Sequence, residues 1–159
     1  MREQLDDTAA MQLAIRASQQ ALAAGNMPFG AALLSQTGQL LHVAGNNQVT
    51  SGDFTGHAEL VLLREASMRL GREALRGTTV FASGEPCAMC SGALFWAGVR
   101  RVVYAVPADA MHALLGGDRL PARCAEVLAG ASPPVRIDGP LLAEAATAVL
   151  RDAAARSAR

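Results

Sequence analysis

Long apolar runs are missing from this 159-residue sequence, although 51% of its residues are hydrophobic. No stretch approaches the roughly 20 apolar residues that span a bilayer. The N-terminus, MREQLDD, carries acidic residues where a secretory signal has a positive segment followed by an apolar one. These absences predict a cytoplasmic protein with no part in the membrane.

Runs of one charge are missing as well, since 14 basic residues balance 14 acidic ones. A surface that binds nucleic acid needs clustered cations against the phosphates, so nucleic acid is not an expected partner. No repeat, low-complexity block or flexible linker divides the chain. A chain of this length and apolar content can bury one substantial core, which predicts a single domain over residues 1–159.

Cysteine is scarce, and three cysteines in a reducing compartment argue against a disulfide framework. Cys87 and Cys90 have the C-x2-C spacing of a metal or redox site. Cys124 stands apart from them, and we expect it to be a small buried apolar residue rather than a ligand.

The order of the expected elements indicates an α/β fold. Helices alternate with short apolar strands, and this alternation favours parallel crossovers. Two strands that enclose the turn at residues 36–38 are expected to form a hairpin at one edge of the sheet. The predicted helices cover residues 8–25, 58–70, 87–96, 109–115, 122–128 and 140 onward, and the predicted strands cover residues 29–34, 40–44, 78–82, 101–106 and 135–137.

Four residues in two short motifs carry the chemistry: His57 and Glu59 in one, and Cys87 and Cys90 in the other. Three ligands suit a catalytic zinc, which leaves its fourth position to water, whereas a structural zinc is closed by four. At the beginning of a helix, free backbone N–H groups and the helix dipole stabilise thiolates. The sequence therefore predicts Zn²⁺ bound by His57, Cys87 and Cys90, with Glu59 free for proton transfer.

Other interpretations of these motifs stay open. A structural zinc or iron site would need a fourth ligand, and no residue of suitable spacing stands out. A thiol redox pair at Cys87 and Cys90 would leave His57 and Glu59 unexplained. Glu59 could also be a solvated acid beside the helix dipole, and the whole cluster could stabilise an interaction module without catalysis.

Several motifs of this chain resemble the zinc-dependent cytidine deaminase-like superfamily, over about residues 10–106. Within it, the run at residues 28–31 and the pair Phe95-Trp96 are most similar to bacterial guanine deaminases. The resemblance implies a three-layer α/β/α fold with a central mixed sheet of about five strands, and a homodimer. The motifs are Pro28-Phe29-Gly30-Ala31, Asn46-Asn47, His57-Ala58-Glu59 and the run from Ser83 to Trp96.

The resemblance also implies the reaction. Zinc would activate a water molecule, and Glu59 would move protons while ammonia leaves a nucleobase or nucleoside. Guanine, or a close purine or triazine analogue, is the first expected substrate. A tRNA adenosine deaminase and a cytosine or cytidine deaminase are the alternatives.

Residues expected at the substrate follow from the same resemblance. Asn46, eleven positions before His57, would read the edge of the base, because its amide can donate and accept hydrogen bonds. Phe29 and Trp96 would wall the ring, and Ala58 would contribute to the pocket. Asn46 could instead be a turn residue, and Trp96 could instead support a subunit contact.

The C-terminal third is harder to interpret. Asp118 lies beyond the last ligand at about the distance at which the resemblance to guanine deaminases implies a second acidic residue, so it is a candidate for binding an amino group or handling a proton. It could equally be a loop acid or a helix cap. The last residues, RDAAARSAR, depart from the guanine deaminase pattern because they lack the aromatic side chains that a lid could use.

Overall fold

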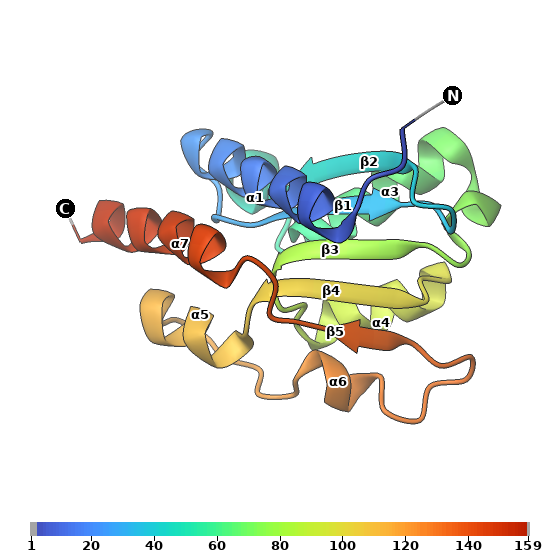
Figure 1. Ribbon diagram of the computed structural model, residues 1–159. Helices are drawn as coiled ribbons and strands as arrows, with labels where there is room; N and C mark the ends of the chain where they lie inside the picture. Colours follow the sequence, from blue (N-terminus) through green and yellow to red (C-terminus); the bar gives the residue numbers. More distant parts are fainter. Residues whose placement is uncertain (1–2, 159) are drawn as a thin grey trace.

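The computed structural model describes residues 3–158 and contains one mixed sheet of five strands (Figure 1). The strand order is β2-β1-β3-β4-β5. β1 runs antiparallel to both β2 and β3, whereas β3, β4 and β5 are parallel. The predicted α/β fold with a mixed sheet is confirmed. The strands are β1 (Gly30–Leu34), β2 (Leu40–Gly45), β3 (Thr79–Gly84), β4 (Arg101–Val106) and β5 (Arg136–Asp138).

Helices cover both faces of this sheet. Figure 1 shows α1 and α7 on one face and α3 and α4 on the other. Within residues 3–158, none of the helices combines the length and the apolar character that crossing a membrane requires. The helices are α1 (Asp7–Ala23), α2 (Gln48–Ser51), α3 (Ala58–Leu70), α4 (Ala88–Ala97), α5 (Ala108–Leu115), α6 (Cys124–Val127) and α7 (Ala143–Ser157), with a 3₁₀ turn, η1 (Arg72–Leu75).

The first helix begins at a capped residue and packs very closely on the sheet. The Asp6 carboxylate accepts a hydrogen bond from the Ala9 N–H at 2.7 Å, which satisfies one free donor of the first turn. A Cβ atom at Gly30 would overlap the carbonyl oxygen of Ala14 and the backbone of Ser18. The glycine in the Pro-Phe-Gly-Ala run is therefore needed where β1 passes under α1.

The core has two halves because side chains alternate across the sheet. On β3, Val80 belongs to the half under α3 and α4, and Phe81 belongs to the half under α1 and α7. Both side chains are fully buried. Cys124 is also fully buried, in the first half, as a small apolar residue.

Three features of the fold differ from the sequence prediction. The short turns α2 and η1 were not predicted, because four residues give no hydrophobic periodicity. The last helix begins at Ala143 rather than at Pro140, because the N–H of Leu141 donates to the Tyr104 carbonyl and Leu142, the N-cap, has left-handed backbone. The expected parallel crossovers hold for β3, β4 and β5, but β1 lies antiparallel beside β3.

Candidate active site

A cavity of about 660 Å³ opens where β3 ends and where α3 and α4 begin. Ligands of α/β proteins bind beyond the carboxyl ends of parallel strands, and cavities of 300–1,000 Å³ are typical of small-molecule sites. None of the described residues of α7 lines the cavity, so the C-terminal helix does not cover it within one chain. Its lining includes seven of the residues expected at the site: Phe29, Asn46, His57, Ala58, Glu59, Cys87 and Asp118.

Two helix beginnings bring the ligands together. His57 is the N-cap of α3 and Cys87 is the N-cap of α4, both with extended backbone. Because His57 lies outside the regular helix, its side chain and that of Glu59 reach the same cavity although the two residues are only two positions apart. Cys90, in the first turn of α4, completes the group.

The distances within this group fit zinc. His57 Nδ1 lies 3.6 Å from the Sγ atom of Cys87 and 3.6 Å from the Sγ atom of Cys90. A tetrahedral zinc with Zn–N near 2.1 Å and Zn–S near 2.3 Å separates nitrogen and sulfur by about 3.6 Å. No fourth His, Cys, Asp or Glu joins the group within residues 3–158, so the donor set is that of an open, catalytic site.

The ionisation of the two cysteine thiols favours the binding of a cation. The Cys90 thiol and His57 both stabilise the Cys87 thiolate, and together they outweigh burial and lower the pKa of Cys87 to about 4. The same hydrogen bond and burial raise the pKa of Cys90. The hydrogen bond with Cys87 also raises the pKa of His57. Without a metal, one proton is therefore retained between the two sulfurs, and a bound cation would displace it.

Glu59 is buried beside the ligands, with 6% of its surface exposed. Burial raises its pKa to about 7; the Cys90 thiol opposes this shift, and the Cys87 thiolate adds to it. Within the described part of the chain, no Lys, Arg or His side chain forms an ion pair with Glu59. A carboxyl group in this state can both accept and release a proton near neutral pH.

Glu85 is a second buried carboxylate of the cavity, which sequence analysis missed. It is 5% exposed and pairs with Arg123 Nη2 at 2.8 Å. The N–H groups of Ala108, at 2.9 Å, and Cys124, at 3.3 Å, also donate to it. Burial alone would raise the pKa of Glu85, but these donors outweigh it and the pKa lies below its ordinary value.

The contacts of Glu85 have a structural consequence. Ala108 begins α5 and Cys124 begins α6, so one carboxylate fastens both ends of segment 108–124 to the end of β3. That segment contributes Asp118, which is exposed at the cavity, and Leu120 on its rim. The only trace of this role in the sequence is an acidic residue directly before Pro86 in an otherwise small and apolar run.

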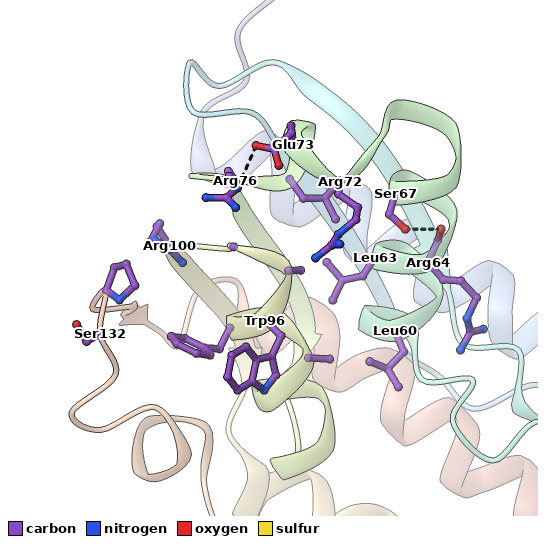
Figure 2. A pocket seen from close by; sticks show the side chains of 16 residues that line it. Leu60, Leu63, Arg64, Ser67, Arg72, Glu73, Arg76, Trp96, Arg100 and Ser132 are labelled. Carbon is purple, nitrogen blue, oxygen red and sulfur yellow. Dashed lines mark hydrogen bonds and ion pairs between the residues drawn. The ribbon is translucent and has the colours of Figure 1, made fainter.

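Trp96 does not lie at this cavity, so the expectation that it walls the ring together with Phe29 is wrong for a single chain. It follows Cys87 by nine positions along α4, and a helix rises about 13.5 Å over nine residues. Figure 2 shows Trp96 at a second cavity, near the opposite end of α4. This cavity has a volume of about 700 Å³, and Leu60, Leu63 and Arg100 also line it. The indole is 81% exposed.

Comparison with known families agrees with this geometry. Residues 4–106 match the cytidine and deoxycytidylate deaminase zinc-binding region. The chain belongs to this deaminase family. The protein is therefore an enzyme that removes amino groups from nucleobases by hydrolysis, and its cofactor is zinc. His57, Cys87 and Cys90 lie close enough together to bind the zinc ion.

Known relatives of the deaminase differ in substrate. A probable cytosine deaminase of Schizosaccharomyces pombe is 35% identical, with 88% of this chain and 87% of the relative covered. A guanine deaminase from Nitrosomonas europaea has a similar structure, with a TM-score of 0.84 and 28% identity over 98% of this chain and 88% of that one. A tRNA-specific adenosine deaminase of Agrobacterium fabrum is 35% identical over 59% of this chain and 61% of its own length.

Two solved structures with similar folds bind small nucleobase analogues. One contains 2,6-diaminopurine, with a TM-score of 0.85 and 29% identity over 96% of this chain and 84% of that one. The other, a variant protein, contains 8-azaguanine, with a TM-score of 0.83 and 29% identity over 94% of this chain and 84% of that one.

Proposed function

We propose that the deaminase releases ammonia from guanine or a close purine or triazine analogue, and that residues 1–159 act as one catalytic domain. The observation that carries this proposal is the position of Glu59 beside the three ligands, on the wall of a cavity of about 660 Å³. The likeness to a guanine deaminase over nearly the whole chain favours guanine among the bases.

The chemistry divides between the metal and the chain. Zinc held by His57, Cys87 and Cys90 supplies a Lewis acid that polarises water. Glu59 takes the proton of the attacking water, delivers it to a ring nitrogen and then helps to protonate the departing amine. Its burial keeps bulk water away from these proton transfers and, in the metal-free chain, raises its pKa to about 7.

The remaining lining residues would hold the ring. Phe29 is half-buried and offers an aromatic wall, and Ala58 is fully buried between His57 and Glu59. Asn46 is 3% exposed and presents an amide to the edge of the base. Asp118 lies on segment 108–124, where its carboxylate could accept a hydrogen bond from an amino group or ring N–H.

A second candidate substrate is cytosine. One relative that is covered almost end to end is a probable cytosine deaminase, and a cavity that holds a purine also has room for a pyrimidine. A tRNA substrate has less support, because the chain has no net charge and binding along an RNA backbone depends on cations.

Ammonia release from a panel of substrates tests this proposal. The panel contains guanine, 2,6-diaminopurine, cytosine, cytidine, a diaminotriazine and a tRNA anticodon stem-loop. We expect the highest kcat/KM with guanine and loss of turnover in Glu59→Gln. Turnover of the stem-loop alone would contradict the proposal, and turnover of cytosine alone would replace guanine by the second candidate.

We also propose that the deaminase is a cytoplasmic homodimer, paired through the surface around Trp96. Trp96 stands edge-on against Phe95, with ring centroids 5.0 Å apart, and projects beside the second cavity (Figure 2). In a two-fold pair, each indole could enter the cavity of the other chain. Tryptophan is enriched among the central residues of protein interfaces.

The proposed cytoplasmic location rests on the cysteines. The free thiols of Cys87 and Cys90 suit a reducing compartment.

Sedimentation analysis of Trp96→Ser tests the homodimer. We expect a dimer for the wild type and a monomer, or at least a 100-fold weaker dimer, for the variant. Met68→Ser is the matched control, because Met68 is equally exposed on α3 but does not line the second cavity. A monomeric wild type, or equal dimerisation of both variants, would contradict this interface.

A further inference from the structure

Gln48 shares the active-site cavity with Asn46 and Glu59, although the sequence motifs do not include it. It is the first residue of α2, the short turn that follows Asn46-Asn47. Its side chain is half-buried, so it can be held by the protein and still face a ligand. Its position raises the question of which hydrogen-bonding groups it offers to a base.

The backbone determines the orientation of both side-chain amides. The N–H of Gln48 can only donate, and it donates to Asn46 Oδ1 at 3.0 Å. The other end of that amide, Nδ2 of Asn46, therefore faces Gln48 and donates to its Oε1 atom at 2.7 Å. Gln48 consequently presents its oxygen to Asn46 and keeps its NH₂ group for other partners.

A count of hydrogen-bonding positions shows what is left for a ligand. A side-chain amide has two N–H donors and an oxygen with two lone pairs. After the bonds with Gln48, Asn46 keeps one N–H and one lone pair. Both N–H donors of Gln48 remain without a hydrogen-bond partner within residues 3–158. The pair as a whole therefore has more donors than acceptors to offer.

The turn that carries Gln48 is itself anchored. The buried side chain of Asn26 accepts hydrogen bonds from the N–H groups of Val49, at 3.1 Å, and Thr50, at 3.0 Å. The N–H of Asn47 donates to the Gly56 carbonyl at 3.0 Å, directly before His57. The donors of Gln48 are thus held in a fixed position relative to the metal ligands, as selective recognition requires.

We propose that Gln48 is a specificity-determining residue, whose NH₂ group donates to a carbonyl oxygen on the base and disfavours an amino group at that place. The inference rests on the proposed function and specifies its substrate class as a base with an oxo group beside the reacting edge. With an amino group there, two donors would face each other, and both would lose hydrogen bonds that they make in water.

The experiment compares guanine with 2,6-diaminopurine, because both carry the 2-amino group and differ in the 6-oxo against the 6-amino substituent. We expect wild-type kcat/KM to favour guanine. Gln48→Leu should lower kcat/KM for guanine about 10- to 100-fold and leave that for 2,6-diaminopurine nearly unchanged. Gln48→Glu keeps an acceptor for Asn46 but has no N–H, so it should shift the preference toward 2,6-diaminopurine.

Gln48→Glu separates selection from positioning. If Gln48 only held Asn46 in place, this variant would keep the wild-type ratio of the two purines, and that result would overturn the inference. Val49→Ala is the matched control, because the Val49 side chain is exposed on the same turn outside the cavity lining; it should leave the ratio unchanged.

Binding measurements keep this test separate from that of the proposed function. Dissociation constants of 8-azaguanine and 2,6-diaminopurine are measured by equilibrium dialysis for each zinc-loaded variant. If guanine is not turned over, the proposed substrate fails, but the ratio of these constants still tests Gln48. A ratio that is equal in wild type, Gln48→Leu and Gln48→Glu, or the absence of purine binding, overturns the inference.

Discussion

Glu59 and Glu85 are buried at the same cavity, yet their pKa values are shifted in opposite directions. Burial raises that of Glu59 to about 7, because the Cys90 thiol and His57 oppose it too weakly, whereas the donors around Glu85 outweigh burial and lower its pKa. Burial therefore does not decide what a carboxylate does; its hydrogen-bonding partners do. Glu59 can therefore exchange a proton near neutral pH, whereas Glu85 stays ionised and accepts the hydrogen bonds that attach segment 108–124.

The first test removes the proton carrier. Glu59→Gln should lower kcat about 1,000-fold or more, since general acid and base catalysis contributes at that scale. Zinc content, measured by atomic absorption, should stay at one ion per chain, because Glu59 is not one of the three grouped ligands. Glu65→Gln, on the exposed side of α3, is the control and should keep full activity. Substantial activity in Glu59→Gln would contradict the proposed role.

The second test uses the sign of the pH dependence in metal-free protein. The unfolded chain ionises Glu59 near pH 4.3, whereas the folded chain retains the proton up to about 7. The contribution of Glu59 to stability, taken as the difference in unfolding free energy between wild type and Glu59→Gln, should therefore fall between these values by about 3–4 kcal/mol in total and remain lower above them. Glu59→Gln should remove this loss, as measured by urea unfolding from pH 4.5 to 8.

Glu85 should show the opposite sign in the same series. Its folded pKa is lowered, so its contribution is present above the unfolded value near 4.3 and disappears as the pH falls through the folded value. The difference between wild type and Glu85→Gln should shrink below pH 4 and stay constant from pH 5 to 8. Parallel pH profiles for Glu59→Gln and Glu85→Gln would break the comparison.

The third test removes the structural carboxylate. Glu85→Ala leaves the N–H groups of Ala108 and Cys124 without their acceptor, which should cost about 2–3 kcal/mol of unfolding free energy. Urea unfolding at pH 7 measures this loss. Glu73→Gln, at an exposed ion pair with Arg76, is the control and should cost less than about 0.5 kcal/mol. Equal effects of the two substitutions would contradict the assigned role of Glu85.

The fourth test measures how much an ion pair near the surface contributes to the free energy of unfolding. Asp7 accepts two hydrogen bonds from Arg101, and these lower the pKa of Asp7, but its side chain is 46% exposed. Asp7→Asn should therefore cost only about 0.5–1 kcal/mol, measured by thermal unfolding, and should not change kcat. A loss as large as that of Glu85→Ala would show that exposure matters less than the comparison assumes.

Sequence reasoning worked best where the chemistry depends on neighbours along the chain. The spacing of Cys87 and Cys90, and of His57 and Glu59, determines how each pair sits at its helix beginning, and the structure places all four together. The helices and strands up to residue 106 were predicted within about two residues. Hydrophobic periodicity and glycine positions carry that information directly.

What the sequence did not reveal depends on contacts between distant residues. Glu85 meets Arg123 across 38 positions, and no local pattern announces that contact. Gln48 belongs to a turn too short to have periodicity. Trp96 sits in the same motif as Cys87, but the rise of the helix between them carries it to another surface. The sequence prediction placed Trp96 at the zinc site because the two residues are close in the sequence, although they lie far apart in the fold.

The attachment of segment 108–124 at both ends suggests how this enzyme could be redesigned. Because Glu85 secures the two anchor points and α5 packs on α7, the loop at residues 116–122, between α5 and α6, can change in length or composition while the sheet and the zinc ligands keep their places. New substrate preferences could therefore be sought by exchanging that loop alone, provided that Arg123 is kept.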